Sequence, residues 1–264
     1  MHIIVCMKQI VDLEKIRIKP DTREPVLEGL PVKFGDFDKN AIEEAVRIKE
    51  KQAEVKVTAV AIGSPKLKDT IKEALAIGAD EAVILTDKAF GGSDEMGTAR
   101  TLAKIVGKIG EFDLILMGEG STDDHSGQVP SRLAELLGLP QVTYIRELQM
   151  LEGKRIRAVR DLEDALEIVE VSLPAIVSVT GELNTPRLPP LTAILKAARK
   201  PTKTWGPADI GLAPGEVGAA ASTINVLSNL APTQQRKEVV LEGAVDDVVD
   251  ELLKALEREG VLTS

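Results

Sequence analysis

The chain has 264 residues, of which 44% are hydrophobic and 28% charged, so we expect a folded protein with a large buried core. The net charge of −9 argues against nucleic acid as a partner, because phosphate binding needs a basic surface. One cysteine and two histidines exclude an internal disulfide and disfavour a zinc or iron–sulfur centre, so we expect no metal site.

Two further absences in the sequence bear on where the protein works. No run reaches the roughly 20 apolar residues needed to cross a bilayer, so we expect no membrane insertion. The first residues carry no basic segment and cleavage site of an export signal. Together with the single cysteine, these features predict a reducing, cytoplasmic setting.

Over the first 137 residues, apolar segments of strand length alternate with segments of helical periodicity. The predicted strands are residues 3–7, 55–62, 82–85 and 114–117, and the predicted helices are residues 40–52, 66–77, 95–109 and 131–137. Continuous apolar strands alternating with amphipathic helices are typical of a parallel sheet covered on both faces. We therefore expect a three-layer α/β/α fold with a mostly parallel, Rossmann-like sheet.

Beyond Pro140 the pattern changes to an antiparallel extension, with predicted strands at residues 142–151, 154–160 and 166–171. An apolar strand follows at residues 175–179, and then a proline-rich loop leads into a short helix. From residue 201 the chain is rich in glycine and proline, and it ends in an amphipathic helix at residues 245–258. We expect an α/β domain over residues 1–200 and an arm over residues 201–264.

The segment 117–129, MGEGSTDDHSGQV, follows a predicted strand and precedes a helix. In open parallel sheets, ligands bind beyond the carboxyl ends of strands, where helix N-termini offer free N–H groups to phosphate. Gly118, Gly120 and Gly127 permit close backbone approach. The same residue types also build plain turns and caps, and both interpretations stay open. The segment matches neither G-x-G-x-x-G nor a P-loop.

The sequence offers no nucleophile paired with a base, so we expect no catalytic residue that makes or breaks bonds. His125 beside Asp123 and Asp124 is more typical of a polar loop than of acid–base catalysis. Lys8 at a strand end fits a phosphate partner, although a solvated lysine is the alternative. Cys6 is expected to be a small buried residue.

The loop at residues 184–191 is too rich in proline to lie inside a strand or helix, and it carries Leu188 and Leu191. A stiff loop with apolar residues, followed by a basic helix, is typical of a surface offered to a partner. The alternative is that Leu191 covers the protein's own core.

Several motifs resemble those of the electron-transfer flavoprotein beta subunit. The signature match comprises Arg160, Asp161, Glu163, Asp164, Glu167, Val169 and the run Pro174-Ala175-Ile176-Val177-Ser178, with Ala165 departing from the usual Gly or acid. Further matches lie at residues 6–8, 35–38, 61–63 and 117–129, with departures at Gly35, Asp36, Gly120 and Pro130.

The resemblance implies a heterodimer in which an alpha subunit holds most of a shared FAD. Electrons would pass from flavin dehydrogenases to this FAD and then to a quinone reductase or another acceptor. The resemblance also implies AMP or a second FAD in this subunit, bound by Cys6, Lys8, Gly35, Asp36, Phe37, Asp38, Ile62, Gly118, Asp123, Asp124, His125, Ser126, Gly127, Gln128 and Val129. The docking residues for a dehydrogenase would be Pro186, Arg187, Leu188 and Leu191.

Residues 89–94 and Thr98 resemble electron-bifurcating relatives, in which the nucleotide is a whole FAD, whereas Glu95 departs from them. A bifurcating form of the same family therefore stays open. So does a stand-alone adenine-nucleotide-binding module, although such a module needs neither the proline-rich loop nor the arm.

Overall fold

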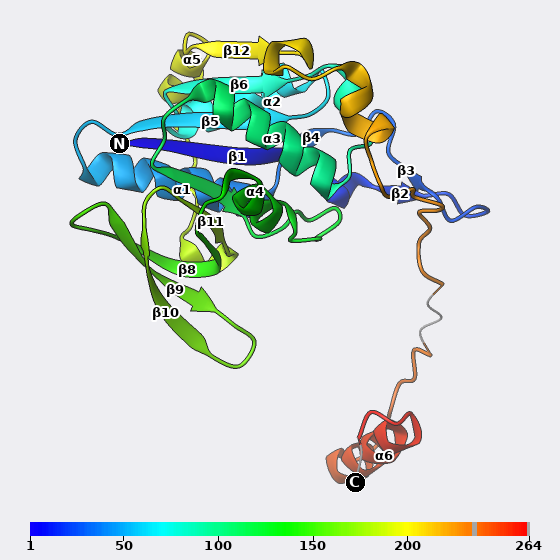
Figure 1. Ribbon diagram of the computed structural model, residues 1–264. Coiled ribbons are helices and arrows are strands. Elements are labelled where there is room, and N and C mark those ends of the chain that lie inside the picture. Colours follow the sequence, from blue (N-terminus) through cyan, green and yellow to red (C-terminus); the bar gives the residue numbers. More distant parts are fainter. Residues whose placement is uncertain (234–236, 263–264) are drawn as a thin grey trace.

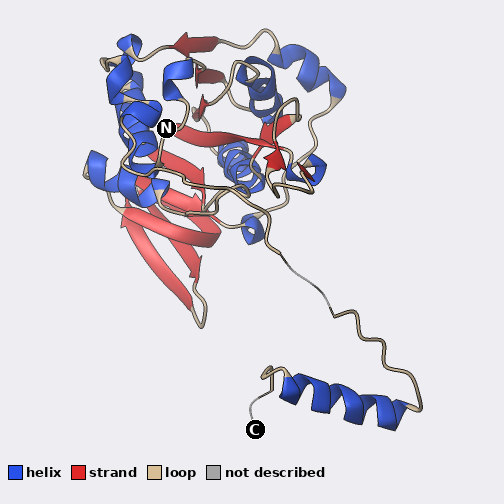
Figure 2. Ribbon diagram, turned by 90° about the vertical axis from the view of Figure 1, so that its right-hand side faces the viewer, coloured by secondary structure: helices blue, strands red, loops and turns tan. Residues whose placement is uncertain are grey.

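The computed structural model describes residues 1–233 and 237–262. Figure 1 shows a layered body built around a central sheet, with the last helix, α6 (Val245–Arg258), standing apart from it. Figure 2, turned by 90°, shows the same separation. Among the described residues, we find no helix with the length and apolar character needed to cross a membrane.

The central sheet is mostly parallel and runs in the order β10-β9-β8-β11-β7-β1-β5-β6-β12, with β4 paired antiparallel to β1. Only β8–β9 and β9–β10 pair antiparallel along that path. The strands are β1 (His2–Val11), β4 (Val32–Phe34), β5 (Lys56–Ile62), β6 (Glu81–Leu85), β7 (Leu114–Gly118), β8 (Gln141–Leu151), β9 (Arg155–Asp161), β10 (Leu166–Ser172), β11 (Ala175–Val179) and β12 (Thr202–Trp205).

Helices cover both faces of the parallel part. One apolar cluster joins the sheet to α1 (Asp36–Lys51), α2 (Leu67–Ile77) and α5 (Leu191–Ala197). The other joins it to α3 (Glu95–Ile109) and α4 (Val129–Leu137). These layers confirm the predicted α/β/α class.

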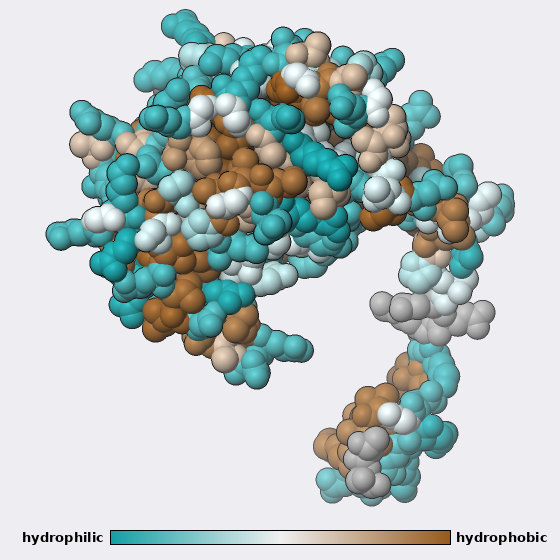
Figure 3. All heavy atoms as spheres, viewed as in Figure 1, coloured by the Kyte–Doolittle hydropathy of each residue, from teal (hydrophilic) through white to brown (hydrophobic). Residues whose placement is uncertain are grey.

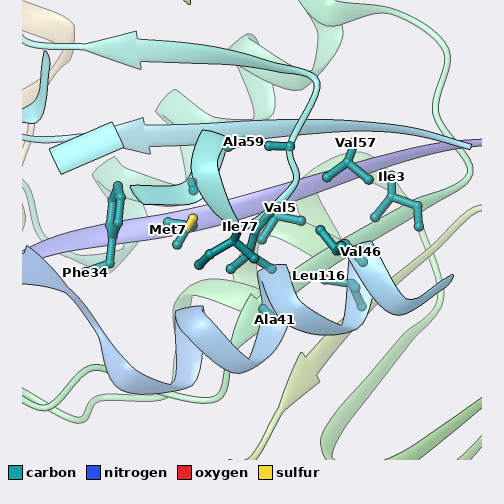
Figure 4. Close-up of a cluster of buried hydrophobic side chains, with 14 of the residues drawn as sticks. Ile3, Val5, Met7, Phe34, Ala41, Val46, Val57, Ala59, Ile77 and Leu116 are labelled. Atoms are coloured by element: carbon teal, nitrogen blue, oxygen red, sulfur yellow. The ribbon is translucent and has the colours of Figure 1, made fainter. Parts of the chain in front are cut away.

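The central strands are apolar throughout because both of their faces are buried. In β1, Ile3, Val5 and Met7 face α1, as Figure 4 shows, whereas Ile4 and Cys6 belong to the cluster under α3 and α4. This two-sided burial explains why residues 3–7 show no alternation of polar and apolar side chains.

Most predicted elements are present with small shifts of their ends. The helix at residues 95–109, the strand at residues 175–179 and the helix at residues 245–258 have the predicted bounds. α1 begins four residues before the predicted start, because residues 36–39 already form its acidic first turn. A small hairpin of β2 (Arg17–Ile18) and β3 (Pro25–Val26) follows the short helix η1 (Leu13–Lys15).

The glycine- and proline-rich composition after residue 200 predicts an irregular arm rather than a packed layer, and for the first part of the arm this prediction is wrong. β12 pairs parallel with β6 at the edge of the sheet. After it come the short 3₁₀ helices η4 (Ala208–Ile210), η5 (Pro214–Glu216) and η6 (Gly218–Ala220), and Ile210 and Val217 are buried in the cluster under α3. The division into units at residue 200 stays a prediction.

Candidate nucleotide-binding site

A cavity of about 820 Å³ lies at the carboxyl ends of β1, β5, β6 and β7. These strands are neighbours in the sheet and run parallel, so the loops that follow them meet at one edge. The walls come from these loops, from the first turns of α3 and α4, and from the arm. They include Cys6, Lys8, Asp38, Ile62, Ser93, Asp94, Glu95, Thr98, Gly118, Asp124, Ser126, Gly127, Gln128, Val129, Ser222, Ile224 and Val226.

Ten of the fifteen residues that the sequence predicts for nucleotide binding line this cavity. They are Cys6, Lys8, Asp38, Ile62, Gly118, Asp124, Ser126, Gly127, Gln128 and Val129. The other five support the lining residues or lie beside them: Gly35, Asp36, Phe37, Asp123 and His125. Among these, Asp36 is exposed and lies 3.7 Å from the ammonium of Lys33.

Asp38 is a buried carboxylate that joins three elements at the cavity wall. Its Oδ2 accepts the backbone N–H of Lys8 at 2.8 Å, and its Oδ1 accepts that of Gly118 at 3.2 Å. Burial raises the pKa of Asp38 to about 7, although the two backbone donors and Lys8 act in the opposite direction. The start of α1 is thereby fixed to the ends of β1 and β7.

Lys8 is held by three side chains of the loop after β7. Its ammonium lies 2.8 Å from Asp123 and from Asp124, and 3.0 Å from the hydroxyl of Ser121. Burial lowers the pKa of Lys8, but the hydrogen bonds to the two carboxylates outweigh this effect and raise it. A phosphate would therefore compete with two carboxylates for this cation.

The loop after β7 is folded tightly against the start of α1. A Cβ added at Gly118 would lie 2.8 Å from both Asp38 and the side chain of Phe37, so only glycine fits there. His125 has φ 49°, and its ring lies 5.8 Å from that of Phe37. Gly127 has φ 64°, a conformation that favours glycine.

The loop leads directly into α4, whose first turn forms part of the cavity wall. No side chain caps this helix: Gln128 stands at the N-cap position without a capping bond. The first N–H groups of a helix have no partner within the helix, and they favour an anion, although Pro130 in this turn has no N–H to contribute. This end of the cavity therefore suits a phosphate group.

The other end of the cavity lies at the start of α3. Asp94 caps that helix through Gly97 and also accepts bonds from the backbone N–H and hydroxyl of Thr223 in the arm. Beside it, the Ser93 hydroxyl and one Glu95 carboxylate oxygen are buried, and neither has a partner within the described chain. Such atoms are costly to leave unpaired, which fits a ligand with polar groups at this end.

The predicted site residues do not include this second end. Residues 89–94 and Thr98 are singled out only by resemblance to bifurcating relatives, from which Glu95 departs. The structure places residues 90–94, Thr98 and Glu95 in the cavity wall, whereas Ala89 is not among the lining residues. The rule that ligands bind at carboxyl ends of strands, applied to β6, could have found them. Ser222, Ile224 and Val226 carry no such signal, because only tertiary folding brings the arm here.

Burial raises the pKa of the Cys6 thiol to about 12, so it is no thiolate and fits the expected role of a small buried residue. Within residues 1–233 and 237–262, we find no group of three or more His, Cys, Asp or Glu side chains arranged to hold a metal ion. The polar and apolar groups of the cavity are suited to binding and orienting a ligand.

The parallel sheet and the cavity at its strand ends define an α/β protein with a ligand-sized cavity at the edge where such sheets bind their ligands. Residues 26–210 match the family described as "Electron transfer flavoprotein domain". The electron transfer flavoprotein subunit beta of Thermoanaerobacterium thermosaccharolyticum is 36% identical over 263 residues, which cover 99% of this chain and 100% of the relative. That of Megasphaera elsdenii is 31% identical with the same coverage.

A third relative, the caffeyl-CoA reductase-Etf complex subunit CarD of Acetobacterium woodii, is 35% identical over 263 residues, again covering 99% of this chain and 100% of the relative. The chain belongs to the electron transfer flavoprotein family, and the two relatives above that carry this name are beta subunits, as its motifs predict.

The raised pKa of Asp38 predicts a specific pH dependence of stability. Its pKa is raised from 3.8 to about 7 in the folded state, so its neutral form is favoured on folding. The contribution of Asp38 to the free energy of unfolding is fully present below about pH 4 and is lost as the pH rises through about 7. A shift from 3.8 to about 7 corresponds to roughly 4 kcal/mol at most.

We expect the stability of the wild type, relative to that of Asp38→Asn, to fall between about pH 4 and pH 7 in urea unfolding. The control is Asp36→Asn, which removes an exposed carboxylate in the same helical turn. The difference in stability between the wild type and Asp36→Asn should stay constant over this pH range. Parallel pH profiles for the wild type and Asp38→Asn would contradict the assignment.

Proposed function

We propose that this chain is the beta subunit of a heterodimeric electron transfer flavoprotein that carries electrons from flavin dehydrogenases to a quinone reductase or another acceptor. The observation that carries the proposal is the cavity at the strand ends, lined by ten of the residues predicted to bind a nucleotide. A bound flavin supplies the redox chemistry, and the chain supplies binding and orientation. The setting that we propose is the cytoplasm.

The cavity is expected to hold an adenine nucleotide, and we favour a second FAD over AMP. The end at residues 118–129 suits a single phosphate, as AMP requires. The cavity continues to Ser93 and Glu95, and its volume of about 820 Å³ lies near the upper end of the roughly 300–1,000 Å³ range of ligand pockets. The same extension supports the bifurcating alternative, whereas Glu95 counts against it because it departs from the residue pattern of the bifurcating relatives.

Two surfaces of the chain favour a partner-dependent subunit over a stand-alone nucleotide-binding module. The docking loop, residues 184–190, exposes Leu188, and α5 begins with Leu191, which is 71% exposed. The helix α6 has apolar and polar sides, as Figure 3 shows, and none of its residues is buried. We propose that α6 packs on an alpha subunit.

Nucleotide binding is tested at Gly127. Gly127→Val should lower the nucleotide content of the purified protein severalfold, because its Cβ would lie 3.3 Å from the backbone carbonyl oxygen of Glu119 and 3.4 Å from the Tyr144 hydroxyl, so the loop that lines the cavity would have to shift. Gly138→Val is the matched control: Gly138 has nearly the same φ, 63°, but an added Cβ would meet no atom within 4 Å. Equal nucleotide content in both variants would count against the site.

Docking is tested at Leu191. A buried anchor typically contributes on the order of 2 kcal/mol or more to a small interface, so Leu191→Ala should raise the KM for a flavin dehydrogenase at least tenfold. The enzyme to use is whichever flavin dehydrogenase of the source cell reduces the wild-type heterodimer fastest. Flavin content and melting temperature should stay near wild type.

The control for Leu191→Ala is Leu136→Ala, on α4, which removes another exposed leucine (44% exposed) from the opposite layer. An unchanged KM in Leu191→Ala, or early melting of that variant, would remove Leu191 from the anchor role.

The role of α6 is tested by co-purification with an alpha subunit. A chain ending at Gly243 should lose most of the complex, and Leu253→Gln on the exposed apolar side should weaken it. Lys254→Gln, the neighbouring charged residue, is the control. A truncated chain that still forms a stable complex would show that the interface lies elsewhere.

A further inference from the structure

The base of the docking loop is attached to α1 by a buried carboxylate. The side chain of Glu43 is only 2% exposed. It accepts hydrogen bonds from the backbone N–H of Arg187 at 3.2 Å and from the Arg187 guanidinium at 2.8 and 3.1 Å. It also accepts one from Arg47 at 2.7 Å, so its negative charge is paired on both sides.

Arg187 has a second carboxylate partner, Glu50, about two helical turns further along α1. Its guanidinium donates to both oxygens of the exposed Glu50, at 2.5 and 2.9 Å. The planar group of arginine thus spans two carboxylates in a fixed orientation, which the compact ammonium of a lysine could not reproduce.

Amide groups fix the loop before Arg187. The Asn40 side chain donates to the backbone carbonyl of Asn184 at 2.6 Å, and the Asn184 side chain donates back to the Asn40 carbonyl at 3.1 Å and to Glu44 at 3.0 Å. Arg47 donates to the carbonyl of Thr185 at 3.1 Å. The backbone is therefore tied to α1 at three of four consecutive residues.

The side chains of Leu188 and Leu191, which follow, are largely exposed, so they do not fix the loop as the side chains of Asn184 and Arg187 do. Leu188 is 94% exposed, and Leu191 is 71% exposed. Their positions are set by the attached base of the loop and by the fixed φ of Pro189 and Pro190. A loop ordered before binding loses less conformational entropy when a partner docks.

We propose that Glu43 is a positioning residue for partner docking: through Arg187 it holds Leu188 and Leu191 in the arrangement that a flavin dehydrogenase recognises. This inference rests on the proposed docking function of the loop. The competing account is that the Glu43–Arg187 contact only contributes to the stability of the fold.

The test is Glu43→Gln in the complete heterodimer, with the same flavin dehydrogenase as for Leu191→Ala. We expect the KM for the dehydrogenase to rise about fivefold to tenfold, while kcat stays within about twofold of the wild type and the nucleotide content stays unchanged. This combination indicates weaker binding of the dehydrogenase with an unchanged transfer step. Hydrogen exchange at the amides of Arg187 and Leu188 should become faster. A purely structural contact would lower the melting temperature without moving the KM.

The control is Glu73→Gln, which removes a carboxylate that pairs with Lys39 at 3.2 Å between α1 and α2. It should leave both KM and exchange unchanged. Arg187→Lys is the second variant, for use if Glu43→Gln does not fold. It keeps the positive charge, loses the two-carboxylate geometry and should raise the KM similarly.

The outcomes separate this inference from the proposed function. If Leu191→Ala raises the KM but Glu43→Gln and Arg187→Lys do not, docking stands and the positioning role is wrong. If Leu191→Ala also leaves the KM unchanged, the docking function itself fails. A higher KM with unchanged exchange at Arg187 and Leu188 would equally overturn the positioning role.

Discussion

The site depends above all on the carboxylate of Asp38. It accepts one N–H from the end of β1 and one from the end of β7, and it belongs to the first turn of α1. Three elements distant in sequence thereby meet at one point of the cavity wall. Gly118 must be a glycine because this contact leaves no room for a Cβ. Burial of the Asp38 carboxyl group is energetically costly, but its two hydrogen bonds fix the geometry of the cavity wall. Such costly buried groups are common in binding sites.

The helix α1 connects this point to the docking loop. Its first turn carries Asp38 at the cavity, and its next two turns present Asn40, Glu43 and Glu44 to residues 184–187. One element thus carries both a wall of the proposed nucleotide cavity and the support of the proposed docking surface. Such an arrangement suits a protein whose work is to hold a cofactor and a partner at fixed positions, because electron transfer depends on positioning more than on acid–base groups.

Much of the fold follows from local patterns. The two-sided apolar strands and the amphipathic helices predict the α/β/α layers, and the rule for strand ends places residues 118–129 and Ile62 at one cavity. What could not be predicted depends on tertiary contacts. β12 is a short strand of mixed polarity that is recognisable only through its pairing with β6. The contact of Asp94 with Thr223 joins residues 129 positions apart. Likewise, no spacing in the sequence shows that Lys8 is paired with Asp123 and Asp124.

The central claim is that this chain holds a nucleotide of its own beside the flavin shared with an alpha subunit. The most direct test is to release the ligands of the purified heterodimer with acid and to identify and count them by mass. The account predicts two adenine nucleotides per heterodimer, of which one is FAD and the other a second FAD or AMP. A single FAD per heterodimer, with no further nucleotide, would contradict it.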